Sequence, residues 1–138
     1  MKGKTINEMK IGDTASFSKT ITDSDVKMFA GITGDLNPVH INREFAKDTI
    51  FKDRIAHGML VASLFSTVLG TQLPGEGAIY AGQEMKFIKP VYLEDTITAT
   101  VTVTEIDIEK NRVTLETIAS NQNEDIVIKG FAKLMPAR

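Results

Sequence analysis

The chain has 138 residues, of which 42% are hydrophobic and 25% charged, as in one ordinary globular domain with an apolar core. Its sixteen Lys and Arg are scattered among eighteen Asp and Glu, so we expect no nucleic-acid partner, which would need a concentrated basic surface. With no cysteine, the chain has no disulfide, zinc–thiolate site or thiol nucleophile.

Neither the amino-terminal residues nor the longest apolar stretch suggests a secreted or membrane protein. Residues 1–13 carry lysines without an apolar run behind them, so we expect no secretory signal. The longest apolar stretch, residues 59–69, contains hydroxyl side chains and is shorter than the about 20 residues that span a bilayer. We therefore expect a soluble cytoplasmic protein.

The first third of the chain predicts a strand followed by a helix. Residues 15–21 alternate loosely, as in a short strand. Thr22 and Asp25 then form a near capping box, which is typical of a helix start. Gly31 and Gly34 are expected to end that helix.

A turn and a buried helix follow. Residues 35–38 are expected to form a loop, because Pro38 disfavours helical geometry at the residue before it. Asn42 can cap a further short turn. Residues 58–69 are apolar on nearly every side, which predicts a helix inside the protein that ends at Gly70.

The second half changes to the two-residue period of β-strands. Alternating or β-rich runs separated by short turns predict four more strands: residues 79–88, 96–104, 113–119 and 126–134. Consecutive strands with short turns favour an antiparallel sheet, and a helix that is apolar all round needs this sheet to curl about it. We expect an α+β fold that a second subunit completes, because five strands cannot cover the helix fully.

Asp35 and His40 are the candidate catalytic pair. They lie five residues apart across the Asn37-Pro38 turn, so the loop can aim a carboxylate and an imidazole at one point. Adding water to an alkene conjugated to a thioester needs a base for the water and a proton for the α-carbon, and this pair can supply both. Asn37 is a candidate supporting residue of this site, but it also has a purely structural interpretation, since Asn before Pro commonly builds turns.

The same reaction needs hydrogen-bond donors for the negative charge that builds on the thioester oxygen. His57-Gly58-Met59 enters the buried helix, and N–H groups in a first helical turn have no internal partner and lie at the positive end of the dipole. Gly58 lets a carbonyl approach that backbone closely. For His57 the sequence favours a positional role, with the ring bonded to backbone, over acid–base catalysis.

Two linked motifs resemble the MaoC-like hydratase family, specifically its single-domain (R)-specific enoyl-CoA hydratases. They are Gly34-Asp35-Leu36-Asn37-Pro38-Val39-His40 and Ala56-His57-Gly58-Met59-Leu60-Val61-Ala62-Ser63-Leu64-Phe65-Ser66. The similarity continues through residues 73–75 and 85–91, and so covers most of the chain.

The resemblance implies one hot-dog domain over residues 1–138, in which an antiparallel sheet wraps around one central helix. It implies a homodimer that hydrates trans-2-enoyl-CoA reversibly by syn addition, with no cofactor, since CoA is part of the substrate. Asp35 and His40 would hold and activate the water, and the N–H of Gly58 would bind the thioester oxygen. Ser66 would help to order the catalytic loop.

Three alternatives share these residues. The same kind of fold can hydrolyse acyl-CoA, and the thiol carrier can be acyl carrier protein, which would make the chain a 3-hydroxyacyl dehydratase. The chain can also be a non-catalytic acyl-CoA binding subunit. A metal site is not expected, because two histidines seventeen residues apart without clustered carboxylates form a poor ligand set.

Overall fold

The computed structural model describes residues 2–138, and Met1, the first residue of the predicted domain, lies outside the described residues. Its five strands are β1 (Thr14–Thr20), β2 (Ile79–Phe87), β3 (Thr96–Asp107), β4 (Arg112–Ser120) and β5 (Ile126–Met135). They form one sheet in the order β1-β3-β4-β5-β2, and every neighbouring pair is antiparallel. The predicted five-stranded antiparallel sheet is therefore confirmed.

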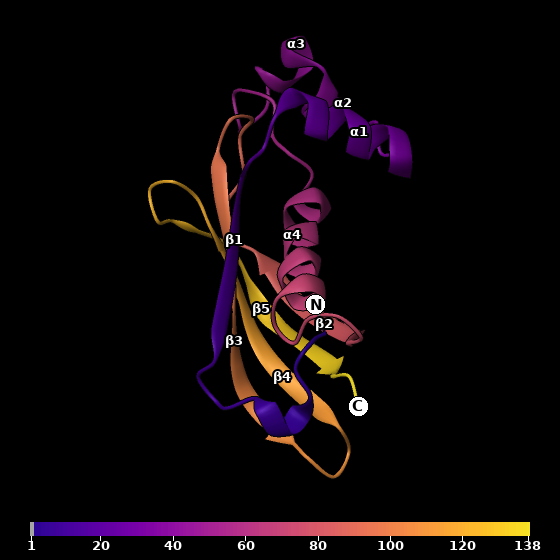
Figure 1. Ribbon diagram of the computed structural model, residues 1–138. Helices are drawn as coiled ribbons and strands as arrows, with labels where there is room; N and C mark the ends of the chain where they lie inside the picture. The colour runs from indigo at the N-terminus through magenta and orange to yellow at the C-terminus, as the bar shows by residue number, and fades with distance from the viewer. Residues whose placement is uncertain (1) are drawn as a thin grey trace.

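The helices gather on one side of this sheet. They are α1 (Asp23–Thr33), α2 (Pro38–Ile41), α3 (Arg43–Ala46) and α4 (Gly58–Thr71), and a 3-10 turn spans Ile6–Glu8. Figure 1 shows α4 running along the sheet, with α1, α2 and α3 grouped together beyond its amino-terminal end. None of the helices within residues 2–138 has the length and apolar character needed to cross a membrane.

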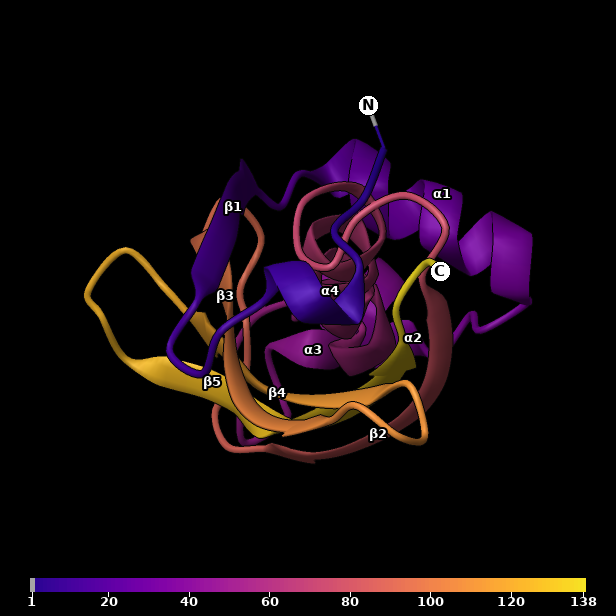
Figure 2. The same cartoon turned by 60° about the horizontal axis from the view of Figure 1, so that its bottom comes forward.

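The sheet curls around α4, which confirms the predicted hot-dog arrangement. Seen nearly along the helix in Figure 2, the strands form an arc from β1 to β2 with α4 inside it. The side chains that α4 buries are Val61, Ala62, Leu64, Phe65, Val68 and Leu69. The opposite side of the helix is open, since Met59 is 57% exposed in the single chain.

The alternation in the third strand has the two faces that the sequence predicted. Ile97, Ala99 and Val101 are fully buried against α4. Hydroxyl side chains line the other face and pair across strands, with Ser18 bonded to Thr98 and Thr20 bonded to Thr96, both at 2.7 Å. Such cross-strand pairs stabilise the register of β1 on β3.

Three predicted helix boundaries were wrong. Gly31 lies within α1, and the helix ends at Gly34, whose φ of 80° requires a left-handed conformation that favours glycine. Gly70 lies within α4, which continues to Thr71. Pro38 belongs to the first turn of α2 rather than to the loop, because proline lacks an N–H that a first turn would leave unpaired.

Candidate active site

The loop between α1 and α2 carries Asp35. The helix before it starts at the predicted capping box, in which Thr22 and Asp25 exchange hydrogen bonds of 3.0 and 3.1 Å. Within the loop, Asp35 Oδ1 accepts from the Asn37 N–H at 3.2 Å, and Asn37 Oδ1 accepts from the Val39 N–H at 3.2 Å. Asn37 therefore caps α2, and these contacts agree with its structural interpretation.

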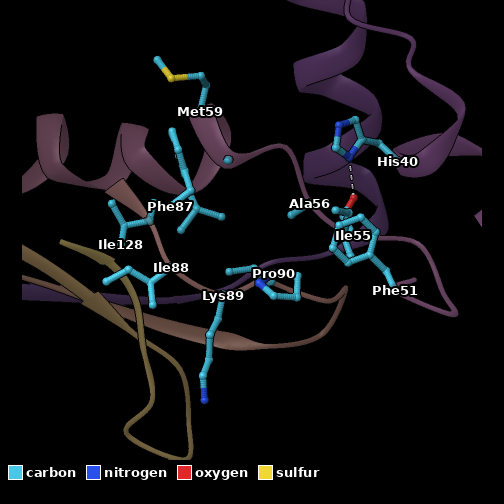
Figure 3. Close-up of a pocket in the computed structure, with 13 residues that line it drawn as sticks. His40, Phe51, Ile55, Ala56, Met59, Phe87, Ile88, Lys89, Pro90 and Ile128 are labelled. Carbon is cyan, nitrogen blue, oxygen red and sulfur yellow. Dashed lines mark hydrogen bonds between the residues drawn. The ribbon is translucent and has the colours of Figure 1, made fainter. Parts of the chain in front are cut away.

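His40 lies on α2 and is 9% exposed. Its Nδ1 donates to the carbonyl oxygen of Ile55 at 2.7 Å, a bond drawn in Figure 3. Because a carbonyl oxygen can only accept, Nδ1 carries the proton, and Nε2 of the neutral ring holds a free lone pair. The imidazole is thus set up as a base.

Arg54 holds the backbone of His40, and the sequence analysis did not single it out. Its Nε donates to the carbonyl oxygen of His40 at 2.7 Å, and its terminal nitrogen forms an ion pair with Asp23 at 2.7 Å. The arginine is only 7% exposed. Lys27 first and then Arg54 hold the pKa of the Asp23 carboxyl below its usual range. Arg54 therefore joins Asp23, at the start of α1, to the backbone of His40.

The structure brings Asp35 and His40 together, as the spacing predicted, and adds His57. One ligand atom from each of the three side chains lies within 4.8 Å of the other two. The rings of His40 and His57 stack, with centroids 3.9 Å apart and planes inclined by 28°. Nε2 of His57 donates to the backbone carbonyl of Asp35 at 3.0 Å, so its ring is bonded to backbone, as predicted.

The sequence predicted no metal site, because the two histidines lie far apart in the chain without clustered carboxylates, but the structure brings Asp35 close to both of them. The three side chains nonetheless fit a shared metal ion poorly. Imidazole lone pairs lie in the ring plane, so the lone pairs of two stacked rings lie in separate, only slightly inclined planes and do not readily converge on one ion. One nitrogen of each ring is also engaged by a carbonyl oxygen. The geometry suits proton transfer better than tetrahedral coordination.

The pKa of His40 is lowered from its ordinary value. Burial is the largest cause, since it disfavours the charged imidazolium, and the neighbouring His57 lowers the pKa further. The hydrogen bond to Ile55 and the charge of Asp35 act in the opposite direction. The net result keeps the ring neutral near pH 7 and able to accept a proton.

Gly58 is the first residue of α4, and its N–H has no acceptor among residues 2–138. It lies at the positive end of the helix dipole, where a developing negative charge is stabilised. A Cβ at this position would meet Cε1 of Phe87 at 2.6 Å. Glycine at position 58 thus has a packing reason in addition to the predicted close approach of a substrate carbonyl.

An apolar pocket of ≈ 450 Å³ connects His40 to Gly58. In Figure 3 its apolar wall of Met59, Phe87 and Ile128 lies apart from His40, and Lys89 points away from the imidazole. Asp35 is exposed and lies beside this pocket rather than in its lining. A pocket of this size and character suits a hydrocarbon chain whose reactive end reaches the imidazole.

Ser66 was predicted to help order the catalytic loop. It is exposed in the single chain and lines a second apolar groove between α4 and β2, together with Phe29, Met59 and Met85. Its hydroxyl forms no hydrogen bond with other described residues, so its supporting role stays a prediction.

The structure defines a hot-dog protein in which a carboxylate and two imidazoles meet beside an apolar pocket, and comparisons with known proteins identify its family. The MaoC like domain matches residues 7–124, so the chain belongs to the MaoC-like family. It is 52% identical over 132 residues to an (R)-specific enoyl-CoA hydratase of Rhodospirillum rubrum, covering 95% of this chain and 91% of that protein.

A second sequence relative and a solved structure support the same family. An (R)-specific enoyl-CoA hydratase of Aeromonas caviae is 42% identical over 124 residues, covering 90% of this chain and 92% of that protein. The solved structure of the R-hydratase PhaJ1 from Pseudomonas aeruginosa, in its unliganded form, superposes with a TM-score of 0.92 at 39% identity. That superposition covers 99% of this chain and 88% of the other.

We predict that His40 titrates below the ordinary histidine pKa of about 6.5. Because the charge of Asp35 favours the imidazolium, Asp35→Asn should lower the pKa of His40 further. NMR titration of the two histidine Cε1–H signals, assigned with His40→Gln, measures both values. A pKa at or above 6.5, or an upward shift in Asp35→Asn, would contradict the electrostatic account.

Proposed function

We propose that this protein is an (R)-specific enoyl-CoA hydratase, a hydro-lyase that adds water reversibly to trans-2-enoyl-CoA to form (R)-3-hydroxyacyl-CoA. The observation that carries the proposal is the free Nε2 of a neutral His40 beside the Asp35 carboxylate, with an unpaired helix N–H at the other end of the same pocket. The names of the two relatives above, at 52% and 42% identity, support it.

The reaction divides between these groups. Asp35 and His40 hold a water molecule, and the pair takes one proton from it as its oxygen bonds to C3 of the enoyl group. The π electrons shift toward the thioester, and the N–H of Gly58 stabilises the charge on its oxygen. The pair then returns one proton to C2. Both additions come from the face that the pair occupies, which gives syn addition.

Hydration of crotonyl-CoA, followed as the loss of the conjugated enoyl absorbance, tests the proposal. Asp35→Asn and His40→Gln should each lower kcat by roughly two to four orders of magnitude, as is typical for general acid–base groups. The fold should stay intact, because both side chains have near-isosteric replacements. Chiral analysis of the product should give the (R) isomer.

Parallel assays separate the alternatives. Release of free thiol from acyl-CoA, detected with a disulfide dye, would indicate a thioesterase instead. Faster turnover of enoyl groups on acyl carrier protein than on CoA would indicate a 3-hydroxyacyl-ACP dehydratase. If the wild type hydrates no short- or medium-chain enoyl thioester, or if the Asp35 and His40 variants keep full activity, the proposal fails.

The oxyanion role of Gly58 can be tested through its backbone. Proline is well accepted as the first residue of a helix, and His57 already has a ψ of 132°, which suits a residue before proline. Gly58→Pro removes the N–H, whereas Gly58→Ala keeps the N–H and adds only a Cβ that Phe87 must accommodate.

Removal of one oxyanion donor typically costs about a hundred- to a thousandfold in kcat. The kcat of Gly58→Pro on crotonyl-CoA should therefore be lower than that of Gly58→Ala by a factor of this order. Circular dichroism should show that both variants are folded. Equal activity of the two variants would remove the N–H from the mechanism and leave only the packing against Phe87.

We propose further that the protein works as a homodimer through the open side of α4 and the edge strand β2. This edge leaves unpaired backbone groups, and the apolar groove between the two elements has Met59 and Tyr80 57% and 39% exposed. We also propose that residues 1–138 act as one domain, because all five strands share one sheet. We further propose that the protein is cytoplasmic, and cell fractionation tests this.

Light scattering should give about twice the chain mass of 15.1 kDa. Ser63→Glu places a charge in the groove and should produce a monomer, because burying an unpaired charge is unfavourable. Thr71→Glu, on the exposed end of the same helix, is the matched control and should stay dimeric. A monomeric wild type at tens of micromolar would refute this assembly.

A further inference from the structure

His57 occupies a position between the base and α1 that the proposed mechanism does not use. Only 2% of the side chain is exposed. One face of its ring stacks on His40 at 3.9 Å, and the ring of Phe29 packs near it at 4.9 Å with an inclination of 56°. Packing against these two rings in a buried site leaves the imidazole little freedom to rotate.

The hydrogen bond from Nε2 of His57 to the carbonyl of Asp35 ties the catalytic loop to the rest of the protein. It spans 22 residues of sequence. Within residues 2–138, the other hydrogen bonds of residues 34–37 connect them to residues no more than four positions away. The exposed loop is thus attached to the start of α4 through this one imidazole.

The second ring nitrogen makes a purely structural role hard to explain. Nδ1 of His57 is fully buried and has no hydrogen-bond partner among the described residues. An unpaired buried acceptor destabilises the folded state, and a phenylalanine would fill the same slot without that cost. The feature that phenylalanine lacks is the Nε2–H that reaches Asp35.

The chain position of His57 adds a third connection, because the next residue is Gly58. One side chain therefore holds the loop of Asp35, supports the ring of His40 and directly precedes the proposed oxyanion donor. We propose that His57 is a positioning residue that keeps these three groups in register for the reaction. This inference rests on the hydratase function proposed above.

Two replacements separate the two contacts of the ring. His57→Gln keeps an amide N–H near the place of Nε2–H but cannot stack, whereas His57→Phe stacks but has no donor. Misplacement of catalytic groups by about 1 Å can cost a hundredfold in rate. We expect kcat to fall about 10- to 100-fold in His57→Phe and less in His57→Gln, with KM within about twofold in both.

Thr67→Ala is a control on the same helix, and it should keep the kcat of the wild type. Phe29→Leu is a second probe, since it removes the ring that packs near His57 without removing a polar side chain. It should lower kcat in the same direction by a smaller factor. This variant keeps the inference testable if a replacement at position 57 does not fold.

The pH profile provides a readout that a residue acting only as core packing would not change. The charged and titratable groups around His40 are Asp35 on the loop, Arg54 and its partner Asp23 at the backbone, His57 on its face and Lys89 in the pocket lining. After burial, the proximity of His57 is what lowers the pKa of His40.

Both replacements remove the imidazole, so the acid limb of kcat/KM, which reports protonation of the His40 base, should move to higher pH in both. If the variants keep the wild-type kcat and acid limb, His57 has no positioning role, although the hydratase function would stand. If the wild type shows no hydration, NMR titration of His40 in the same variants still decides whether the two rings are coupled.

Discussion

Burial of α4 inside the curled sheet is the constraint on which the rest of the site depends. Phe65, Val68 and Leu69 are fully buried against the strands, so the helix cannot slide or rotate without opening cavities. The place where α4 begins is therefore fixed, and with it the N–H of Gly58, which no side-chain rotation can move. Figure 1 shows that α1 and α2 gather at this end of the helix. The loop between them carries Asp35, and α2 carries His40.

Backbone carbonyls fix the protonation pattern of the site. The carbonyl of Ile55 requires a proton on Nδ1 of His40, and the carbonyl of Asp35 requires one on Nε2 of His57. Burial then keeps His40 neutral, so its free nitrogen is a base near pH 7. Arg54 donates to the backbone carbonyl of His40, and its guanidinium charge is paired with Asp23.

Local signals predicted local structure well where side chains decide it. The Thr22–Asp25 capping box and the cap that Asn37 forms on α2 recur in the structure because their contacts lie within a few residues. The alternation along β3 recurs because successive side chains of a strand point to opposite faces of the sheet. Gly31 and Gly70 misled the helix boundaries. A glycine inside a helix costs only about 1 kcal/mol, which tertiary packing can offset.

By itself the sequence determined the curled antiparallel sheet, the buried helix and the meeting of Asp35 with His40, since the periodicity of the chain and the five-residue spacing of this pair specify them. Only the tertiary structure decided that β2 pairs with β5 at the sheet edge, that Arg54 holds the backbone of His40 and that His57 stacks on the His40 ring. These contacts join residues 14 or more positions apart. Which of them form depends on how the packed elements approach one another, and a one-dimensional pattern does not encode that.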